Sequence, residues 1–296
     1  MKQTIFTGAG VALVTPFAAD GSVDYARFGA LIDWQIEQGT DALIIAGTTG
    51  ESSTLTEEEH VEVLRFAVQH TAKRVPIIAG TGSNDTAFAV SLSKEAQALG
   101  ADALLLVTPY YNKTSQNGLY MHYKTIAEAV DLPIILYNVP SRTGMTIEVE
   151  TAARLAEIEN IVAMKDAVGN ITYTAKLIER CGDALTVYSG NDDMIVPMMS
   201  LGAKGVISVL SNVLPRETHE MTAAALRGDF KTAAEMQLKY LKLVNALFIE
   251  TNPIPVKEAM NRMGLEVGEC RLPLYRMSDS NAAVLAAELQ KHGLTK

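Results

Sequence analysis

Cysteine and tryptophan are scarce in this chain. Its 296 residues include one tryptophan and two cysteines, Cys181 and Cys270. Two cysteines so far apart exclude a disulfide framework and argue against a zinc site built on them. Because the first residues also lack a signal-peptide pattern, we expect reduced thiols and a cytoplasmic protein.

Positive charge and long apolar runs are lacking as well. The chain has 25 lysines and arginines against 34 aspartates and glutamates, a net charge of -9. This balance argues against nucleic acid or an anionic membrane surface as a partner, although a small anionic substrate can still bind a locally basic pocket. No apolar run reaches the roughly 18 residues that a membrane-spanning helix needs.

What the sequence does contain is a series of eight short apolar runs. They cover residues 10–15, 42–47, 75–80, 103–109, 133–137, 161–165, 185–189 and 205–209. Continuous rather than alternating hydrophobicity is typical of parallel strands buried on both faces. Amphipathic segments with helix caps, such as the capping box of Thr56 and Glu59, lie between them. The pattern predicts a (β/α)8 TIM barrel. A doubly wound open sheet is the alternative, but no glycine-rich dinucleotide fingerprint follows the first run.

The strand pattern ends at Val209. Two helices separated by Gly228 follow, then a short helix after two prolines, and a last helix over residues 282–292. We therefore expect a catalytic barrel over residues 1–226 and a C-terminal helical extension over residues 227–296.

Unusual polar residues follow the apolar runs. The segments are GTTGES (47–52), TPYYNK (108–113), YNVPSRTG (137–144) and SGND (189–192), while Lys165 ends the sixth run. In (β/α)8 barrels the catalytic groups lie at the carboxyl ends of the strands, so these residues are expected to meet on one rim. No cluster of histidines and carboxylates has metal-ligand spacing, and we expect no metal.

Lys165 closes an apolar strand, where an ammonium is costly to desolvate. It either reaches solvent or pairs with the adjacent Asp166, or it serves as an amine nucleophile. Burial disfavours the ammonium form, and a free amine attacks a ketone to form a Schiff base. The cationic imine acidifies the neighbouring carbon, so this class I aldolase chemistry needs no cofactor.

Tyr137 ends the neighbouring strand, about 4.8 Å away across a parallel pair. Its hydroxyl is a candidate proton shuttle, with Thr48 and Thr49 as hydrogen-bond partners. Arg142, two residues after YNVP, is a candidate bidentate clamp for a substrate carboxylate. Taken singly, these residues also suit a core aromatic, a plain turn and a surface arginine.

Four motifs in order, GTTGES, TPYYN, YNVPSRTG and AMKDA, resemble the pyruvate-dependent class I aldolase and lyase family, which includes N-acetylneuraminate lyase. The similarity extends from VALVTPF to NPIPVKEAM. The paired threonines, paired tyrosines and arginine match members that condense pyruvate with L-aspartate 4-semialdehyde in lysine and diaminopimelate biosynthesis. A sugar-acid or hydroxy-oxo-acid aldolase of the same family, and a non-catalytic ligand-binding barrel, are the alternatives.

For the substrates, the resemblance implies that Lys165 forms an imine with pyruvate and that no separate cofactor is needed. It implies that Thr49 and nearby backbone hold the pyruvate carboxylate and that Arg142 binds the carboxylate of the semialdehyde. The main chain near Gly190 and Ile207 is expected to line the pocket.

For the protons, the resemblance implies that Tyr137 is linked through Thr48 to Tyr111, which reaches into the site of a neighbouring subunit. That role requires at least a dimer. The implied assembly is a homotetramer, with a dimer as the alternative.

Some members of the family are inhibited by lysine at a site between subunits. The matching positions are Ser52, Ser53, Glu57, His60, Asn84, Phe88 and Tyr110. Inhibitable members usually carry a glutamate where Phe88 stands, and often a histidine where Glu57 stands.

We expect lysine to inhibit this chain weakly or not at all. Phe88 cannot accept a hydrogen bond or balance the charge of an ammonium, and a missing partner for a charged group costs about 1.5–3 kcal/mol. Glu57 is the one carboxylate among the seven positions, and it can replace the lost one. An activity titration with lysine is the measurement, and strong inhibition at submillimolar lysine contradicts the expectation.

Overall fold

A ring of eight parallel strands forms the centre of the molecule. The computed structural model describes residue 2 and residues 4–295. The strands are β1 (Gly8–Ala12), β2 (Ala42–Ile45), β3 (Ile77–Gly80), β4 (Ala103–Val107), β5 (Ile134–Asn138), β6 (Ile161–Asp166), β7 (Thr186–Ser189) and β8 (Gly205–Ser208). They pair in chain order, and β8 pairs with β1 to close the barrel. The prediction of a TIM barrel is confirmed, and the open sheet is excluded.

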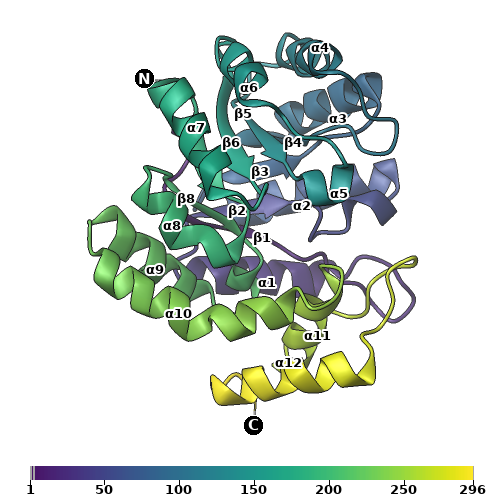
Figure 1. Ribbon diagram of the computed structural model, residues 1–296. Coiled ribbons are helices and arrows are strands. Elements are labelled where there is room, and N and C mark those ends of the chain that lie inside the picture. The colour runs from purple at the N-terminus through teal and green to yellow at the C-terminus, as the bar shows by residue number, and fades with distance from the viewer. Residues whose placement is uncertain (1, 3, 296) are drawn as a thin grey trace.

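Helices follow the strands and surround the barrel (Figure 1). They are α1 (Tyr25–Glu37), α2 (Glu57–Thr71), α3 (Thr86–Leu99), α4 (Gln116–Ala127), α5 (Pro140–Thr143), α6 (Val149–Leu155), α7 (Ile171–Cys181), α8 (Ile195–Ser200) and α9 (Pro215–Leu226). The capping box of Thr56 and Glu59 begins α2 as predicted, with both of its hydrogen bonds present. Gly100 ends α3 in the left-handed conformation at φ 90°, where glycine has no steric cost.

The first strand lies two residues earlier than the apolar run 10–15 predicts. Gly8 and Ala9 extend the strand because they pair with Gly205 and Val206 of β8. The strand ends at Ala12, and the Leu13 amide makes one more hydrogen bond to β2, donating to the Ile44 carbonyl. Hydrophobicity alone gives no signal for two small residues, so the pattern placed this strand too late.

The barrel has an apolar interior and an apolar outer layer. Along β6, Met164 belongs to the layer between strands and helices, whereas Lys165 lies beside Tyr137, a member of the interior cluster. Inside the barrel the ring of Tyr188 stacks on that of Phe6 at 4.4 Å, and the Tyr188 hydroxyl donates to the Phe6 carbonyl. Both rings belong to the interior cluster, which also contains Tyr137.

Three helices follow the barrel. They are α10 (Phe230–Leu247), α11 (Ile254–Arg262) and α12 (Asp279–Lys291), and Figure 1 shows them together on one side of the molecule. Asp229 caps α10 as predicted, accepting a hydrogen bond from the Thr232 amide. α10 packs against α9, and α12 packs against α10 and α11.

A buried ion pair joins this extension to the barrel. The Nζ of Lys257, on α11, lies 2.9 Å from the Oε1 of Glu51 in the loop after β2, and the two side chains are 2% and 0% exposed. Lys257 also donates to the carbonyls of Thr15 and Glu269. The second carboxylate oxygen of Glu51 accepts from the Arg271 amide. Both charges are thus fully paired, as buried charges must be.

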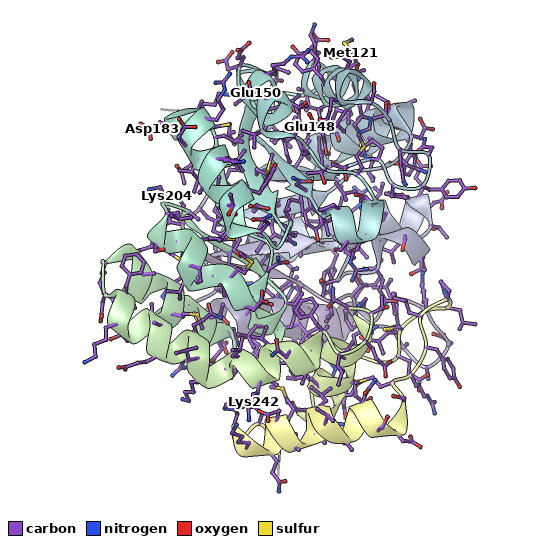
Figure 2. The ribbon with its side chains drawn as sticks, viewed as in Figure 1. Met121, Glu148, Glu150, Asp183, Lys204 and Lys242 are labelled. Carbon is purple, nitrogen blue, oxygen red and sulfur yellow. The ribbon has the colours of Figure 1, made fainter. Side chains whose placement is uncertain are left out.

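Charged side chains gather on the outer surface. In Figure 2 the labelled Glu150 and Lys204 lie at the periphery, on α6 and just before β8. Among the residues that the structure describes, no helix combines the length and apolar character needed to cross a bilayer.

Substitution of Lys257 is expected to destabilise the protein strongly. Lys257→Met leaves the negative charge of Glu51 buried without a positive partner, and breaking a buried pair costs about 3–5 kcal/mol. The shift of the denaturant midpoint measures the loss. Arg262→Ala is the matched control, because Arg262 pairs with Glu258 on the surface of the same helix, and such pairs contribute at most about 1 kcal/mol. Equal effects of the two substitutions would show that the buried pair has no special role.

Candidate active site

A cavity of about 510 Å³ opens at the carboxyl ends of the strands. Six of the residues predicted for the site line it: Thr48, Thr49, Tyr137, Arg142, Lys165 and Gly190. The remaining lining residues are Val139, Ser141, Ala167, Asn191, Val209, Phe248, Glu250, Thr251 and Asn252. The last four come from the segment between α10 and α11, so the extension supplies one wall.

Lys165 lies inside the barrel mouth between two tyrosines. It pairs in register with Tyr137 on β5 and with Tyr188 on β7. Its side chain is buried at 6% exposure, and Nζ lies 4.2 Å from the centroid of the Tyr137 ring. A cation over an aromatic face is stabilised by about 2 kcal/mol when desolvated. The ring therefore stabilises a positive charge at Nζ, and Lys165 at the same time lines the cavity.

Asp166 points away from Lys165. Its carboxylate accepts hydrogen bonds from the Val168 amide at 3.0 Å and from the Thr174 hydroxyl, on α7, at 2.6 Å. Burial raises the pKa of the Asp166 carboxyl, and these two hydrogen bonds oppose the rise. Pairing with Asp166 therefore does not explain Lys165, and neither does escape to solvent.

Asp192 is a second buried carboxyl, and the positive charge of Lys165 acts on it. It follows β7, and its Oδ2 accepts from the amides of Val209 and Leu210 at 3.0 and 2.9 Å. Burial raises its pKa, while the hydrogen bond from Ser208, the two amides and the positive charge of Lys165 lower it. Sequence analysis assigned no role to Asp192, although it ends the SGND motif.

The loop that carries Thr48 and Thr49 is backbone-strained. Ala46 and Glu51 flank it at φ 53° and 56°, in the left-handed region, at a cost of order 1–3 kcal/mol each. Gly80 of β3 lets the loop approach, since a Cβ there would lie 2.4 Å from the Ala46 carbonyl oxygen. Such strain persists only where surrounding contacts fix it, and it is typical of functional loops.

Arg142 and Thr49 are joined through Asn252, a residue that sequence analysis missed. The guanidinium of the exposed Arg142 donates to the Asn252 carbonyl at 2.9 Å. The Asn252 side-chain Nδ2 donates to the Oγ1 of Thr49 at 3.0 Å. The only signal was its place in NPIPVKEAM, which marked the resemblance but suggested no chemistry.

Two predicted residues lie outside the cavity. Tyr111 has φ 68° and is 91% exposed, and its side chain does not line the cavity of its own chain. Ile207 is 1% exposed in the barrel interior, while Val209 lines the cavity. Within the described residues of one chain, no hydrogen bond connects Tyr137, Thr48 and Tyr111.

The seven positions that match the lysine-inhibition site lie away from this cavity. His60 is buried, with Nε2 2.8 Å from the Gly80 carbonyl oxygen, and burial lowers its pKa. The main-chain carbonyl of Asn84 accepts a hydrogen bond from the Asn112 side chain. Phe88 is half-buried on α3. The remaining positions are Ser52, Ser53, Glu57 and Tyr110, of which Tyr110 is 38% exposed.

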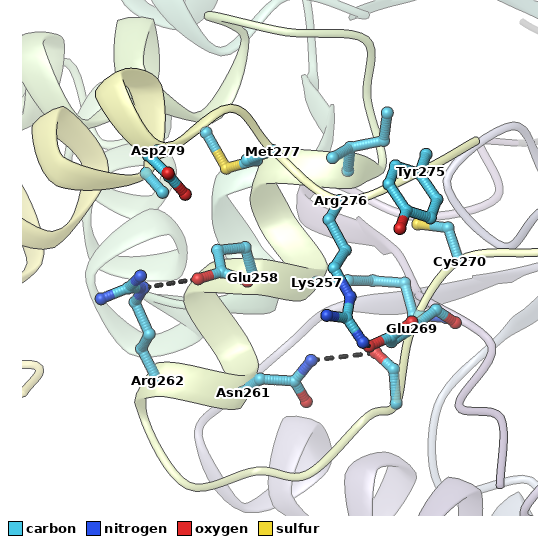
Figure 3. A pocket seen from close by; sticks show the side chains of 13 residues that line it. Lys257, Glu258, Asn261, Arg262, Glu269, Cys270, Tyr275, Arg276, Met277 and Asp279 are labelled. Atoms are coloured by element: carbon cyan, nitrogen blue, oxygen red, sulfur yellow. Dashed lines mark hydrogen bonds and ion pairs between the residues drawn. The ribbon is translucent and has the colours of Figure 1, made fainter. Parts of the chain in front are cut away.

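A second cavity, of about 430 Å³, lies within the extension (Figure 3). Its charges neutralise one another, since Arg262 pairs with Glu258 and Arg276 with Glu269. Burial raises the pKa of the Cys270 thiol to about 12, which suppresses the reactive thiolate. In the part of the chain that the structure describes, no group of three or more metal-ligating side chains forms. The chemistry therefore points to the first cavity.

Comparison with known proteins gives one consistent result. The model of the dihydrodipicolinate synthetase family matches residues 5–292. A Lachnoclostridium phytofermentans protein named 4-hydroxy-tetrahydrodipicolinate synthase is 60% identical over 293 residues, covering 99% of this chain and 100% of that one. The crystal structure of dihydrodipicolinate synthase from Aquifex aeolicus is 51% identical with a TM-score of 0.96, covering 98% and 99% of the two chains. The Acinetobacter baumannii enzyme, complexed with pyruvate, is 49% identical with a TM-score of 0.96, covering 98% and 100%.

The hydroxyl and the ring of Tyr137 are expected to have different roles, proton transfer for the hydroxyl and contact with Lys165 for the ring. Tyr137→Phe keeps the ring over Lys165 but removes the proton carrier, so turnover should fall by about 10²–10⁴-fold while the lysine still forms an imine with a keto acid. Tyr188→Phe is the matched control on the other side of Lys165, because that hydroxyl bonds to the main chain of Phe6, donating to its carbonyl and accepting from its amide. Unchanged turnover in Tyr137→Phe would show that its hydroxyl belongs to the core alone.

Proposed function

The chain belongs to the dihydrodipicolinate synthetase family, and on that premise we propose how it condenses pyruvate with L-aspartate 4-semialdehyde. The reaction gives 4-hydroxy-tetrahydrodipicolinate, in lysine and diaminopimelate biosynthesis, through a Schiff base on Lys165. The observation that carries the proposal is the buried Lys165 amine beside Tyr137 in a cavity that also presents Arg142. The names of the relatives support this reaction and do not support the sugar-acid alternative.

In the first half-reaction, the Lys165 amine attacks C2 of pyruvate. Water leaves, and a cationic imine joins Nζ to C2. The Thr49 hydroxyl and nearby main chain, including that at Gly190, hold the pyruvate carboxylate. A proton then leaves C3, and its electron pair moves towards the iminium nitrogen to give an enamine. No cofactor takes part, because the imine itself is the electron sink.

In the second half-reaction, the enamine carbon attacks the aldehyde of the semialdehyde. Arg142, at the mouth of the cavity, binds the carboxylate of this substrate with its planar donor fork. The substrate amine then attacks the imine carbon, which closes the ring and releases the Lys165 amine. The covalent link between Nζ of Lys165 and C2 of pyruvate is thus formed in the first half-reaction and broken in the second.

Tyr137 moves the protons in these steps, with Thr48 as its neighbour on the rim. Tyr111 completes the relay in the cavity of a second subunit. Its exposed ring and left-handed backbone support this role, since a strained aromatic directed into water needs a partner surface to fix it. The proposed assembly is accordingly a homotetramer, with a dimer as its smallest active form, in the cytoplasm.

The barrel over residues 1–226 and the extension over residues 227–296 form one catalytic unit in this proposal. The extension places Asn252 and Glu250 at the cavity wall and fixes the loop of Thr49 through Lys257. Removal of the extension would therefore remove part of the site.

Reductive trapping tests the proposal. The protein is incubated with pyruvate and borohydride, and mass is expected to be added to the peptide that contains Lys165. Lys165→Ala is the control and should gain no mass. Turnover is then assayed with pyruvate and aspartate semialdehyde, and against cleavage of N-acetylneuraminate and 2-keto-3-deoxygluconate. An unmodified Lys165 peptide, or faster sugar-acid cleavage than condensation, contradicts the proposal.

Arg142→Ala is expected to weaken binding of the semialdehyde without affecting the reaction with pyruvate. It should leave the pyruvate adduct on Lys165 intact but raise the KM for the semialdehyde by about 10–100-fold, the loss expected for hydrogen bonds to a charged group. Equal loss of adduct formation and semialdehyde affinity would mean that Arg142 only supports the fold.

A further inference from the structure

We propose that Asn252 is a positioning residue that directs the hydroxyl hydrogen of Thr49 towards the carboxylate of the keto acid bound to Lys165. This inference rests on the proposed function and adds a residue to it. Asn252 acts through Thr49 and belongs to the extension rather than to the barrel.

The geometry around Asn252 is simple. Its side chain is 5% exposed and lines the cavity. In the described residues its single side-chain hydrogen bond runs from Nδ2 to the Oγ1 of Thr49, at 3.0 Å. Its Oδ1 is buried and has no partner there. Thr49, itself 2% exposed, makes no other side-chain hydrogen bond within the same residues.

This one bond sets the direction of the Thr49 hydroxyl. A threonine hydroxyl has one hydrogen and two acceptor lone pairs, whereas the NH₂ group of an amide can only donate. Because Asn252 occupies a lone pair of Thr49, the hydroxyl hydrogen turns elsewhere and is available to an acceptor in the cavity. A carboxylate is such an acceptor, and hydrogen bonds to ionised groups are about twice as strong as neutral ones. A donor already aimed at its acceptor needs no reorganisation when the substrate binds.

Stability of the fold does not account for Asn252. A buried amide oxygen without a partner costs about 1–3 kcal/mol, and an apolar side chain would avoid that cost. The same residue offers its main-chain carbonyl to Arg142 at 2.9 Å. Asn252 therefore lies between the two groups proposed to bind carboxylates, and only its side chain serves Thr49. Side-chain substitution tests the Thr49 contact and leaves the Arg142 acceptor in place.

Steady-state kinetics of Asn252→Ala and Asn252→Asp test the proposal. In a two-step reaction through a covalent intermediate, kcat/KM for pyruvate reports the first half-reaction and kcat/KM for the semialdehyde the second. Asn252→Ala should lower kcat/KM for pyruvate by about 5–10-fold, the loss of one hydrogen bond, and that for the semialdehyde by less than about threefold.

Asn252→Asp should be more harmful than Asn252→Ala, by about a further tenfold in kcat/KM for pyruvate. An ionised carboxylate only accepts, so it draws the Thr49 hydrogen away from the substrate and also repels the substrate carboxylate. A purely structural role predicts the reverse order, because the aspartate side chain has nearly the shape of asparagine. Equal losses for both substrates, or a milder effect of Asn252→Asp, overturn the proposal.

A double-mutant cycle with Thr49→Val shows whether Asn252 acts through Thr49. Once the hydroxyl is removed, Asn252→Ala should change kcat/KM for pyruvate by less than about twofold, because coupled residues are not additive. Additive losses overturn the proposal. If Asn252→Ala does not fold, Asn252→Asp and the same cycle with Thr49→Val decide the question alone.

Asn261→Ala is the matched control. Asn261 lies on α11 and makes two hydrogen bonds with the main chain of residues 267 and 268, outside the proposed site. It should lower the melting temperature without changing the ratio of the two kcat/KM values. Borohydride trapping with pyruvate separates the two levels of failure: no adduct on wild-type Lys165 overturns the proposed function, whereas a normal adduct with unchanged Asn252 variants overturns this inference alone.

Discussion

The constraint on which the structure depends is the burial of the Lys165 amine at the end of a barrel strand. An amine in that place loses hydration, so its surroundings must tolerate it without a neutralising carboxylate at contact distance. The Tyr137 ring, 4.2 Å from Nζ, provides this on one side. Asp166, the nearest carboxylate in sequence, is instead bonded to Thr174 on the outer face. The lysine is therefore not held in an ion pair with Asp166, as its proposed role as a nucleophile requires.

A second constraint is the strained loop of Thr48 and Thr49. Two residues with positive φ flank it, and Gly80 leaves room for it to approach β3. The forces that fix this loop come from far along the chain, through the buried pair of Glu51 and Lys257 and the hydrogen bond from Asn252. The extension is thus part of the site's construction, since it both shapes the loop and forms a cavity wall.

The sequence predicts the barrel and most of the rim because both depend on local patterns. The TIM barrel is predicted by eight apolar runs with helix caps between them, and Lys165 and Tyr137 by their place at the ends of two strands. Sequence analysis missed Asn252 and Asp192 because their partners lie far away in the sequence. Asn252 contacts Thr49 and Arg142, and Asp192 accepts from amides just after β8. The start of β1 was misplaced because Gly8 and Ala9 pair through their backbones and carry no hydrophobic signal. Tyr111 points away from its own site, which residue types alone do not reveal.

The most direct test of the central claim, that Lys165 is the nucleophile, is a crystal structure of the protein grown or soaked with pyruvate. The account predicts continuous density from Nζ of Lys165 to C2 of pyruvate, with the carboxylate within hydrogen-bond distance of the Thr49 hydroxyl and Asn252 still bonded to Thr49. Pyruvate held without a covalent bond to Lys165, or with its carboxylate on Arg142, would contradict the account.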